Sequence, residues 1–451
     1  MSMASEPGLR LPAPFAVDPL ALHLADPQTY PFLLQSTADG TAQGRYDILF
    51  AAPGERVVLH ADGQLNGAAA DTSAFLDALD RQWTNAAAVP LSGPPFSGGW
   101  FLLLGYELAG EVEPSLQLPQ PGGLPVAVAV RVPVAMVRDR QTGSAWITAE
   151  AGYGAEARSL ATALAASRAV RDSTRSLLAA GVSEAPPAEF LAAVGAAKDY
   201  IRAGDVFQAN LSREWHARTV PGVRAGDIYA RLRHANPGPF AGLAVLDDCA
   251  VISSSPERLV SRRGLAIETR PIAGTRPRGA AGAGDQPARA ELLGHPKERA
   301  EHVMLIDLER NDLGRVCAPG TVTVDEFMTL ESYAHVHHIV SNVSGRARDE
   351  VTPAQLIRAV FPGGTITGCP KVRCMEIIAE LEGRARGFYT GAMGYLGHDG
   401  NLDLNILIRT MVTQHDRLSL AAGSGIVADS VPERELEETR AKAKGMLLAL
   451  E

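Results

Sequence analysis

The sequence predicts an α+β fold in which antiparallel strands predominate, and turn length carries this prediction. Strand-like runs in the second half follow one another through turns as short as HDGN at 398–401 and QHDR at 414–417. Turns of this length join antiparallel strands, because a parallel crossover needs a dozen residues or more. The composition, 46% hydrophobic and 21% charged residues, is that of an ordinary globular protein. We therefore expect an antiparallel-rich α+β protein and no doubly wound sheet.

In the first half, a Pro-rich tail at 1–17 precedes an α+β subdomain at 18–182. We expect the tail to lie on the surface or to be disordered. Residues 71–86 carry apolar side chains on one helical face, and the Ala-rich stretch 154–180 predicts a second helix. Strand-like runs around these helices lie at 45–51, 98–108, 126–139 and 144–150.

A domain boundary is expected in SEAPPAEF at 183–190, with a second and larger domain at 188–451. This domain begins with a predicted helix at 188–203 that ends at Gly204. The β-rich runs that follow predict strands at 206–217, 242–247, 250–255, 258–263, 265–272, 387–396, 402–413 and 417–422.

Two of these predicted strands have polar faces. In VFQANLSREW, alternation places Gln208, Asn210 and Ser212 on one face. One interpretation is an ordinary solvated face, but the low strand propensity of asparagine favours a binding site. In NLDLNILIRT, the polar face consists of Asp403, Asn405 and Arg409.

Two Glu-x-x-Glu pairs lie in segments with helical patterns, Glu298 with Glu301 and Glu435 with Glu438. Residues three apart share one face of a helix. Four carboxylates that converge from two helices would repel one another unless a divalent cation lies between them, and hard oxygen ligands suit Mg²⁺. The alternative is that these glutamates belong to exposed helix surfaces.

Two glycine-rich segments are candidate binding loops. FPGGTITGCPK is not a Walker loop, because Cys-Pro-Lys follows Gly368. AGSGIVAD has the spacing of a dinucleotide-binding loop, but the residues after it leave no room for the second strand of a βαβ unit. We expect Gly423, Ser424 and Gly425 to form a turn before a helix, whose N–H groups bind a carboxylate or a phosphate.

A histidine cluster lies in AHVHHIVSNVSG, where strand alternation separates His338 from His335 and His337. The strand context and the lack of neighbouring thiols argue against zinc. We expect one functional histidine beside two structural ones.

The formal net charge of −9 argues against non-specific binding to nucleic acid or to an anionic membrane. The apolar runs are far shorter than a membrane-spanning helix, and the N-terminal residues lack a signal pattern. The four cysteines show no C-x-x-C spacing, so they predict neither a zinc site nor a disulfide framework. We expect a cytoplasmic protein without nucleic-acid or membrane partners.

Eight ordered motifs resemble those of the chorismate-utilising enzymes, specifically the large (component I) subunits of aminodeoxychorismate synthase and anthranilate synthase. The resemblance runs from about 190 to 450 and is traceable earlier in YPFLLQS and FSGGWFLLLGYEL. It implies two antiparallel-rich sheets packed between helices, an α/β/β/α sandwich to which both halves of the chain contribute. The motifs are GDVFQANLSR, SSSPERLV, TRPIAGTRPRG, RAEHVMLIDLERNDLGR, VHHIVSNVSG, FPGGTITGCPKVRCMEII, GYLGHDGNLDLNILIRT and GSGIVADSVPERELEETRAKA.

The resemblance also implies a site for chorismate and Mg²⁺. It makes Glu301 and Glu438 direct ligands of the ion, and Glu298 and Glu435 holders of its water molecules. Glu257 would be the acid that protonates the departing C4 hydroxyl, which requires a neutral carboxyl before transfer. The other residues that match site positions are Tyr389 and Arg409 for the enolpyruvyl carboxylate, Gly423, Ser424 and Gly425 for the ring carboxylate, and Gly274, Thr275, His338, Thr365 and Lys371.

Gln208 and Ala273 indicate the nucleophile. Relatives that add water to chorismate carry a lysine base where this chain has Gln208, so the resemblance implies ammonia. Many aminodeoxychorismate synthases carry a lysine nucleophile where this chain and anthranilate synthases have alanine, at Ala273. Asn210 and FPGGTITG, however, resemble the aminodeoxychorismate type. We therefore expect amination of chorismate at C4, in p-aminobenzoate and folate synthesis; the alternative is anthranilate synthase, which adds ammonia at C2 and eliminates pyruvate.

The resemblance further implies a separate glutamine amidotransferase subunit as the ammonia source, which high ammonium should replace. LLQS, with Gln35 and Ser36, is similar to the LLES motif of tryptophan feedback and marks a candidate tryptophan site. A NAD-dependent oxidoreductase is disfavoured by the missing βαβ unit. An inactive chorismate-binding scaffold is disfavoured by the presence of the functional residues Glu257, Glu301, Glu438 and Arg409.

Overall fold

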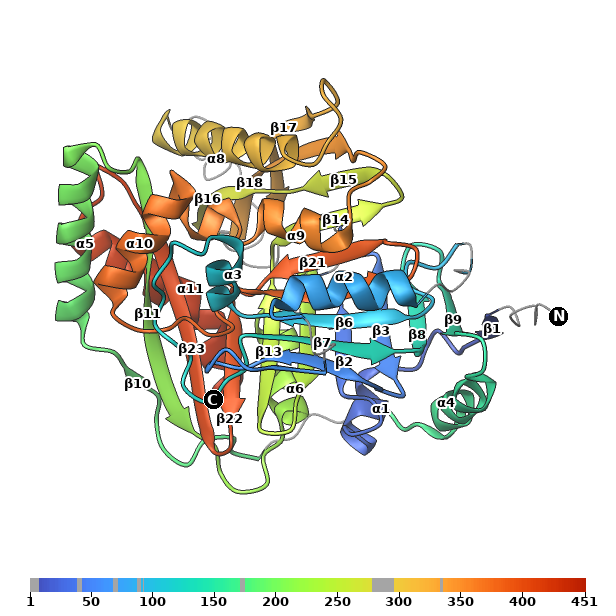
Figure 1. The fold of residues 1–451 in the computed structure, drawn as a ribbon. Coiled ribbons are helices and arrows are strands. Elements are labelled where there is room, and N and C mark those ends of the chain that lie inside the picture. Colours follow the sequence, from blue (N-terminus) through green and yellow to red (C-terminus); the bar gives the residue numbers. More distant parts are fainter. Residues whose placement is uncertain are drawn as a thin grey trace.

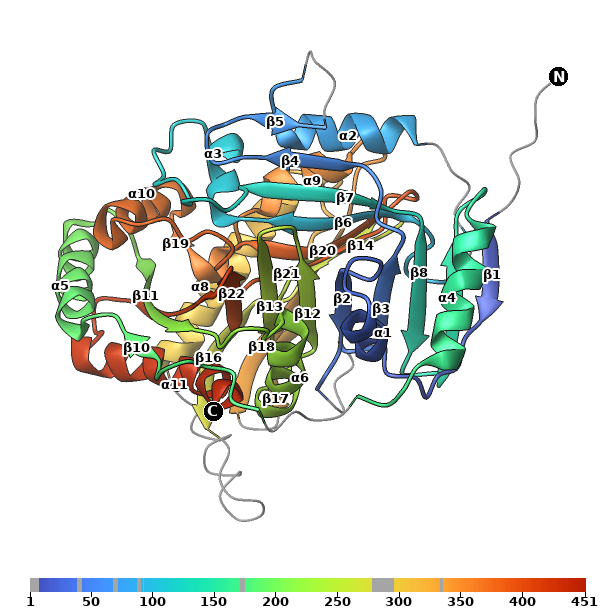
Figure 2. The ribbon, with the colours of Figure 1, turned by 90° about the horizontal axis from the view of Figure 1, so that it is seen from below.

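Two large antiparallel sheets form the centre of the molecule in a computed structural model (Figures 1 and 2). The structure describes residues 8–38, 43–67, 72–86, 91, 93–170, 175–277, 296–332 and 336–451. The side chains of 275–277, 296–298, 332 and 336 also lie outside this description. Within the described residues, one sheet has 12 strands and the other 11.

The first sheet joins strands from both halves of the chain, because β2 pairs with β12. At one end of it, the short β19 (Gly368–Cys369) pairs with β11. Its strands, in spatial order, are β1 (Leu9–Pro12), β9 (Ser144–Ala149), β8 (Val134–Asp139), β3 (Tyr46–Ala51), β2 (Phe32–Gln35), β12 (Phe240–Val245), β13 (Cys249–Ser255), β22 (Thr410–Gln414), β23 (Arg417–Ile426), β11 (Gln208–Arg218) and β10 (Ser183–Glu184).

The second sheet joins the two halves through the pairing of β6 with β20. The long β17 (Thr323–Ser332) pairs with β18 beside the main path of this sheet. The spatial order of the other strands is β16 (Ile272–Pro277), β18 (Val336–Arg346), β15 (Ala266–Thr269), β14 (Arg258–Arg263), β21 (Leu402–Ile406), β20 (Ala392–Gly397), β6 (Gly99–Leu104), β7 (Ala127–Val132), β4 (Arg56–Leu59) and β5 (Leu65–Asn66).

Helices cover the outer faces of both sheets, as the resemblance implied. The helix α2 packs with α9 over the second sheet, whereas α4, α6 and α11 share a core with the first sheet. Between the sheets lies an aromatic core in which Phe32 of β2 stacks on Phe101 of β6, with ring centroids 4.1 Å apart. The α/β/β/α sandwich is confirmed. The helices are α1 (Leu20–Ala25), α2 (Phe75–Asn85), α3 (Ala109–Val112), α4 (Gly154–Ala166), α5 (Pro187–Ala203), α6 (Ala225–Ala235), α8 (Pro296–Gly314), α9 (Pro353–Val360), α10 (Lys371–Glu382) and α11 (Pro432–Leu450), with short 3₁₀ turns η1 (Tyr106–Leu108) and η2 (Gly364–Ile366).

Several expected elements differ from the structure. The strand expected at 265–272 is divided between β15 and β16, and the strand expected at 387–396 begins only at Ala392. The predicted tail contains β1, whose alternating Leu9 and Leu11 are partly buried against the core of the first sheet. The helix expected at 154–180 ends at Ala166, where the hydroxyl of Ser167 donates a hydrogen bond to the carbonyl of Leu164 and competes with the next helical turn. The strand expected at 402–413 is two strands, β21 and β22, separated by residues 407–409.

Candidate active site

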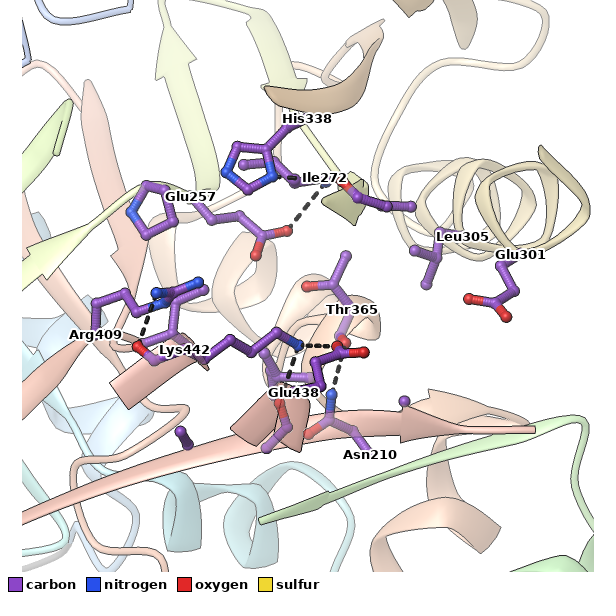
Figure 3. Close-up of a pocket in the computed structure, with 18 of the residues that line it drawn as sticks. Asn210, Glu257, Ile272, Glu301, Leu305, His338, Thr365, Arg409, Glu438 and Lys442 are labelled. Atoms are coloured by element: carbon purple, nitrogen blue, oxygen red, sulfur yellow. Dashed lines mark hydrogen bonds and ion pairs between the residues drawn. The ribbon is translucent and has the colours of Figure 1, made fainter. Parts of the chain in front are cut away.

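A cavity of about 190 Å³ lies where β11 and β23 of the first sheet approach β16, β18, η2, α8 and α11. Figure 3 shows polar side chains from these elements converging on it. The cavity brings together most of the residues that the sequence singled out, from segments as far apart in the chain as Gln208 and Glu438. Those that line it are Gln208, Asn210, Glu257, Ala273, Gly274, Glu301, His338, Thr365, Tyr389, Arg409, Gly423, Gly425, Glu435 and Glu438.

Four expected site residues are not among the lining residues. Lys371 forms an ion pair of 2.5 Å with Asp312 instead. Ser424 is fully buried and alternates with the two glycines that face the cavity. The side chains of Thr275 and Glu298 lie outside the described residues.

The polar side chains of β11 explain why β23 has glycine at positions 423 and 425, because they leave no room there for a larger residue. A Cβ atom at Gly425 would overlap with the side-chain nitrogen of Gln208, and one at Gly423 would lie 2.8 Å from Oδ1 of Asn210. The expected glycine turn before a helix is therefore wrong, since both glycines lie inside a strand that pairs with β11. Their small size leaves room for the two amides above them. Ser212, the third polar residue of this face, is engaged elsewhere, because its N–H and hydroxyl donate to Glu382.

Glu257 is the candidate acid. It lies between β13 and β14, is 3% exposed and accepts a hydrogen bond of 3.3 Å from the N–H of Ile272. Burial raises the pKa of Glu257 to about 8, and nearby Glu309 acts in the same direction, against Thr365 and Ile272. The carboxyl therefore carries a proton at neutral pH, which it can donate to a leaving hydroxyl.

Arg409 and His338 also line the cavity and set its charge. Arg409 follows β21 in the left-handed region, with φ of 53°, and donates a hydrogen bond of 2.8 Å to the carbonyl of Lys442. Burial lowers the pKa of Arg409, but a guanidinium stays charged in proteins. Burial and the Arg409 charge lower the pKa of His338 to about 3, so its imidazole is neutral. Arg409 thus offers a half-buried cation that fits a carboxylate.

Lys442 is a charged lining residue that was not predicted from the sequence. It lies one helical turn after Glu438 on α11, and its Nζ is 2.7 Å from Glu438 and 3.0 Å from the carbonyl of Gly423. The Glu-x-x-x-Lys spacing was the available signal, but this spacing is also common on solvated helices.

Carboxylates from two helices face the cavity, Glu301 from α8 and Glu435 and Glu438 from α11. Their oxygen donors are those that Mg²⁺ prefers, so the donor chemistry and the location fit the expected ion. Among the described residues, no three potential ligands stand close enough to form a finished metal site. An ion would therefore have to compete with Lys442 for Glu438.

The two polar strand faces serve different cavities. Asp403 and Asn405 line a second cavity of about 260 Å³ together with Gln35. Arg409, which strand alternation grouped with them, lines the first cavity instead, because β21 ends at Ile406 and Arg409 takes the left-handed conformation. Ser36 is buried beside this cavity without lining it, and its N–H donates to Asp47.

Known proteins are similar to this chain along most of its length. Residues 30–448 match the family of chorismate binding enzymes. An anthranilate synthase component I-like protein of Synechocystis is 44% identical over 79% of this chain and 73% of that protein. An aminodeoxychorismate synthase component 1 of Bacillus subtilis is 50% identical over 60% of this chain and 58% of its own length. The crystal structure of anthranilate synthase component I from Streptococcus pneumoniae superposes with a TM-score of 0.79, at 33% identity over 90% of this chain and 93% of that chain.

The described helices include none with the length and hydropathy needed to cross a membrane.

Proposed function

The chain belongs to the family of chorismate binding enzymes, and we propose that it transfers ammonia to C4 of chorismate to give 4-amino-4-deoxychorismate. The observation that carries this proposal is the pairing, in one cavity, of the protonated acid Glu257 with the amide Gln208. An amide cannot deprotonate water. Ammonia needs no such base, because its nitrogen already has a free electron pair.

The proposed reaction is balanced by one proton from Glu257. This proton leaves with the C4 hydroxyl as water, while the lone pair of ammonia forms the new C–N bond. The nitrogen then gives one proton back to Glu257, so that its carboxyl is neutral again. General acid catalysis of this kind contributes roughly 10²–10⁴-fold to a rate.

Chorismate is a dianion, and the cavity offers partners for both of its carboxylates. Arg409 presents a guanidinium to the enolpyruvyl carboxylate, beside the hydroxyl of Tyr389. We propose that the ring carboxylate lies against Gly423 and Gly425, towards the glutamates of α8 and α11. Of the glutamates, Glu301 and Glu438 would hold Mg²⁺, with Glu298 and Glu435 around its water molecules. A bound Mg²⁺ would neutralise the ring carboxylate and withdraw electron density from the ring.

Ala273 favours a second candidate function. Its methyl group lines the cavity and supplies no nucleophile, as in anthranilate synthases, which add ammonia at C2 and release pyruvate. Asn210 supports amination at C4 instead, because it lines the same cavity and resembles the aminodeoxychorismate type. We therefore favour amination at C4. In this reaction ammonia attacks the carbon directly, and no covalent lysine intermediate forms.

We further propose that a separate glutamine amidotransferase subunit supplies the ammonia, and that the product serves p-aminobenzoate and folate synthesis. Tryptophan binding at Gln35 and Ser36 stays a prediction.

The test uses purified protein, chorismate, Mg²⁺ and ammonium at mildly alkaline pH, with a coupled assay for pyruvate. Consumption of chorismate without pyruvate, followed by p-aminobenzoate once a lyase is added, supports the proposal. Anthranilate and pyruvate in equal amounts would assign the second candidate. No consumption of chorismate at all would contradict both.

A further inference from the structure

A cluster of buried ionisable groups lies beneath the acid of the cavity. Glu309 and Asp312 of α8 are 6% and 1% exposed, and Lys371 at the start of α10 pairs with Asp312 at 2.5 Å. Glu309 faces η2, since a Cβ atom at Gly364 would lie 3.4 Å from its Oε1. The next residue, Thr365, lines the cavity together with Glu257. Glu309 thus lies against the turn η2, which reaches the cavity that contains the acid.

The charges of this cluster do not balance. Lys371 acts on the two buried carboxyls Glu309 and Asp312, and the exposed Arg315 acts on Asp312 alone. Glu257 is a third buried carboxyl close enough to be affected by Glu309. Burying an uncompensated charge is costly, so buried carboxyls keep protons instead. Burial and the Asp312 charge raise the pKa of Glu309 to about 7, against Lys371, Thr269 and Gly364.

The charge of Glu309 raises the pKa of Glu257. An ionised Glu309 makes Glu257 hold its proton more tightly, whereas Lys442 of α11 acts on Glu257 in the opposite direction. When Glu257 gives its proton to the leaving hydroxyl, its carboxylate becomes negatively charged. A protonated Glu309 adds no second negative charge near it. The charge of Glu309 therefore affects how tightly Glu257 holds its proton.

We propose that Glu309 is a positioning residue whose own proton controls how readily Glu257 donates its proton to the substrate. This inference rests on the proposed role of Glu257 as the acid. It also explains why Lys371, which matches a site position in sequence, lies in this cluster: its ammonium pairs with Asp312 and opposes the rise that burial causes in the pKa of this carboxyl, so that Glu309 is the carboxyl that holds the proton.

The test is the pH dependence of kcat/KM for chorismate between pH 6 and 9, with ammonium adjusted to hold free ammonia constant. The wild-type rate should fall on the alkaline side as Glu257 ionises. Glu309→Gln keeps an oxygen for Gly364 and removes the charge, so the fall should move to lower pH by about half a unit or more. Asp307→Asn is the matched control, because Asp307 is exposed on the same helix and pairs with Arg310; its profile should match the wild type.

Two outcomes separate the inference from the proposed function. An unshifted profile in Glu309→Gln, with turnover abolished in Glu257→Gln, would overturn the inference alone. Wild-type turnover in Glu257→Gln would overturn the proposed acid. Asp312→Asn gives a second measurement: without Asp312, Lys371 favours the ionised form of Glu309, so the alkaline fall should stay in place or move to higher pH. A shift to lower pH in this variant would contradict the inference.

Discussion

The side chain of Gln208 lies against Gly425, so closely that a Cβ atom on this glycine would overlap with the side-chain nitrogen of Gln208. β11 and β23 thereby form one wall of the cavity, with amides on one strand and bare backbone on its neighbour. The wall holds a non-basic amide at the place where relatives that add water have a base.

Gly425→Ala should lower kcat/KM by roughly 10²-fold, because the new methyl group displaces Gln208 by about an ångström. Steady-state kinetics with ammonium would measure the loss. Gly195→Ala on α5 is the control, since a Cβ there meets no atom within 4 Å. This control should keep full activity and gain slightly in helix stability. Equal activity in both variants would show that the position of Gln208 does not matter.

Glu257→Gln should reduce kcat by roughly 10²–10⁴-fold and leave the KM for chorismate nearly unchanged. The amide can still accept the hydrogen bond from Ile272, but it has no proton of suitable acidity to give. Glu350→Gln, at an exposed glutamate, serves as the control. A large rise in KM with unchanged kcat would instead make Glu257 a binding residue.

Glu438→Gln should weaken Mg²⁺ binding by more than roughly tenfold, because even residues around metal ligands contribute that much. Isothermal titration calorimetry of the protein with Mg²⁺ in the presence of chorismate would measure this affinity independently of turnover. The neighbouring Glu437, exposed and paired with Arg440, provides the control Glu437→Gln. Identical Mg²⁺ affinities in the two variants would contradict the assignment of Glu438.

The stability of the protein should fall as pH rises from about 6.5 to 8, above the range in which the neutral His338 has the opposite effect. Burial raises the pKa of Glu257 to about 8 and that of Glu107 to about 7, so the folded state holds protons that the unfolded state has lost. The stability that these protons contribute is fully present below the unfolded pKa and is lost as pH rises through the folded pKa. Chemical denaturation at several pH values would measure the slope, which should be smaller in Glu257→Gln. A slope that is the same in both proteins would show that Glu257 is not protonated in the folded state.

Local patterns predicted much of the fold. The helix α5 follows from its apolar spacing and from Gly204, which ends it in the left-handed conformation with φ of 85°. Short turns predicted antiparallel pairing, which the structure has throughout both sheets. The two-sheet sandwich was implied only by resemblance, and the order of strands was not predicted, because a strand such as β2 finds its partner β12 through contacts that no local pattern contains.

The candidate site was predictable in its residues but not in its arrangement. The spacing of Gly423 and Gly425 suggested a turn, since sequence alone does not reveal that Gln208 and Asn210 lie above them. Strand alternation likewise grouped Asp403 with Arg409, whose left-handed backbone carries it to another cavity. Lys442 and Glu309 looked like ordinary helical residues, because their importance depends on burial and on neighbours from other elements.

The central claim is that ammonia enters at C4, and one measurement tests it most directly. Chorismate is incubated with ¹⁵N-ammonium, Mg²⁺ and the protein, and the coupling between ¹⁵N and the ring carbons of the product is recorded by NMR. The account predicts nitrogen on C4 with the enolpyruvyl group retained. Nitrogen on C2, with or without loss of pyruvate, would contradict it.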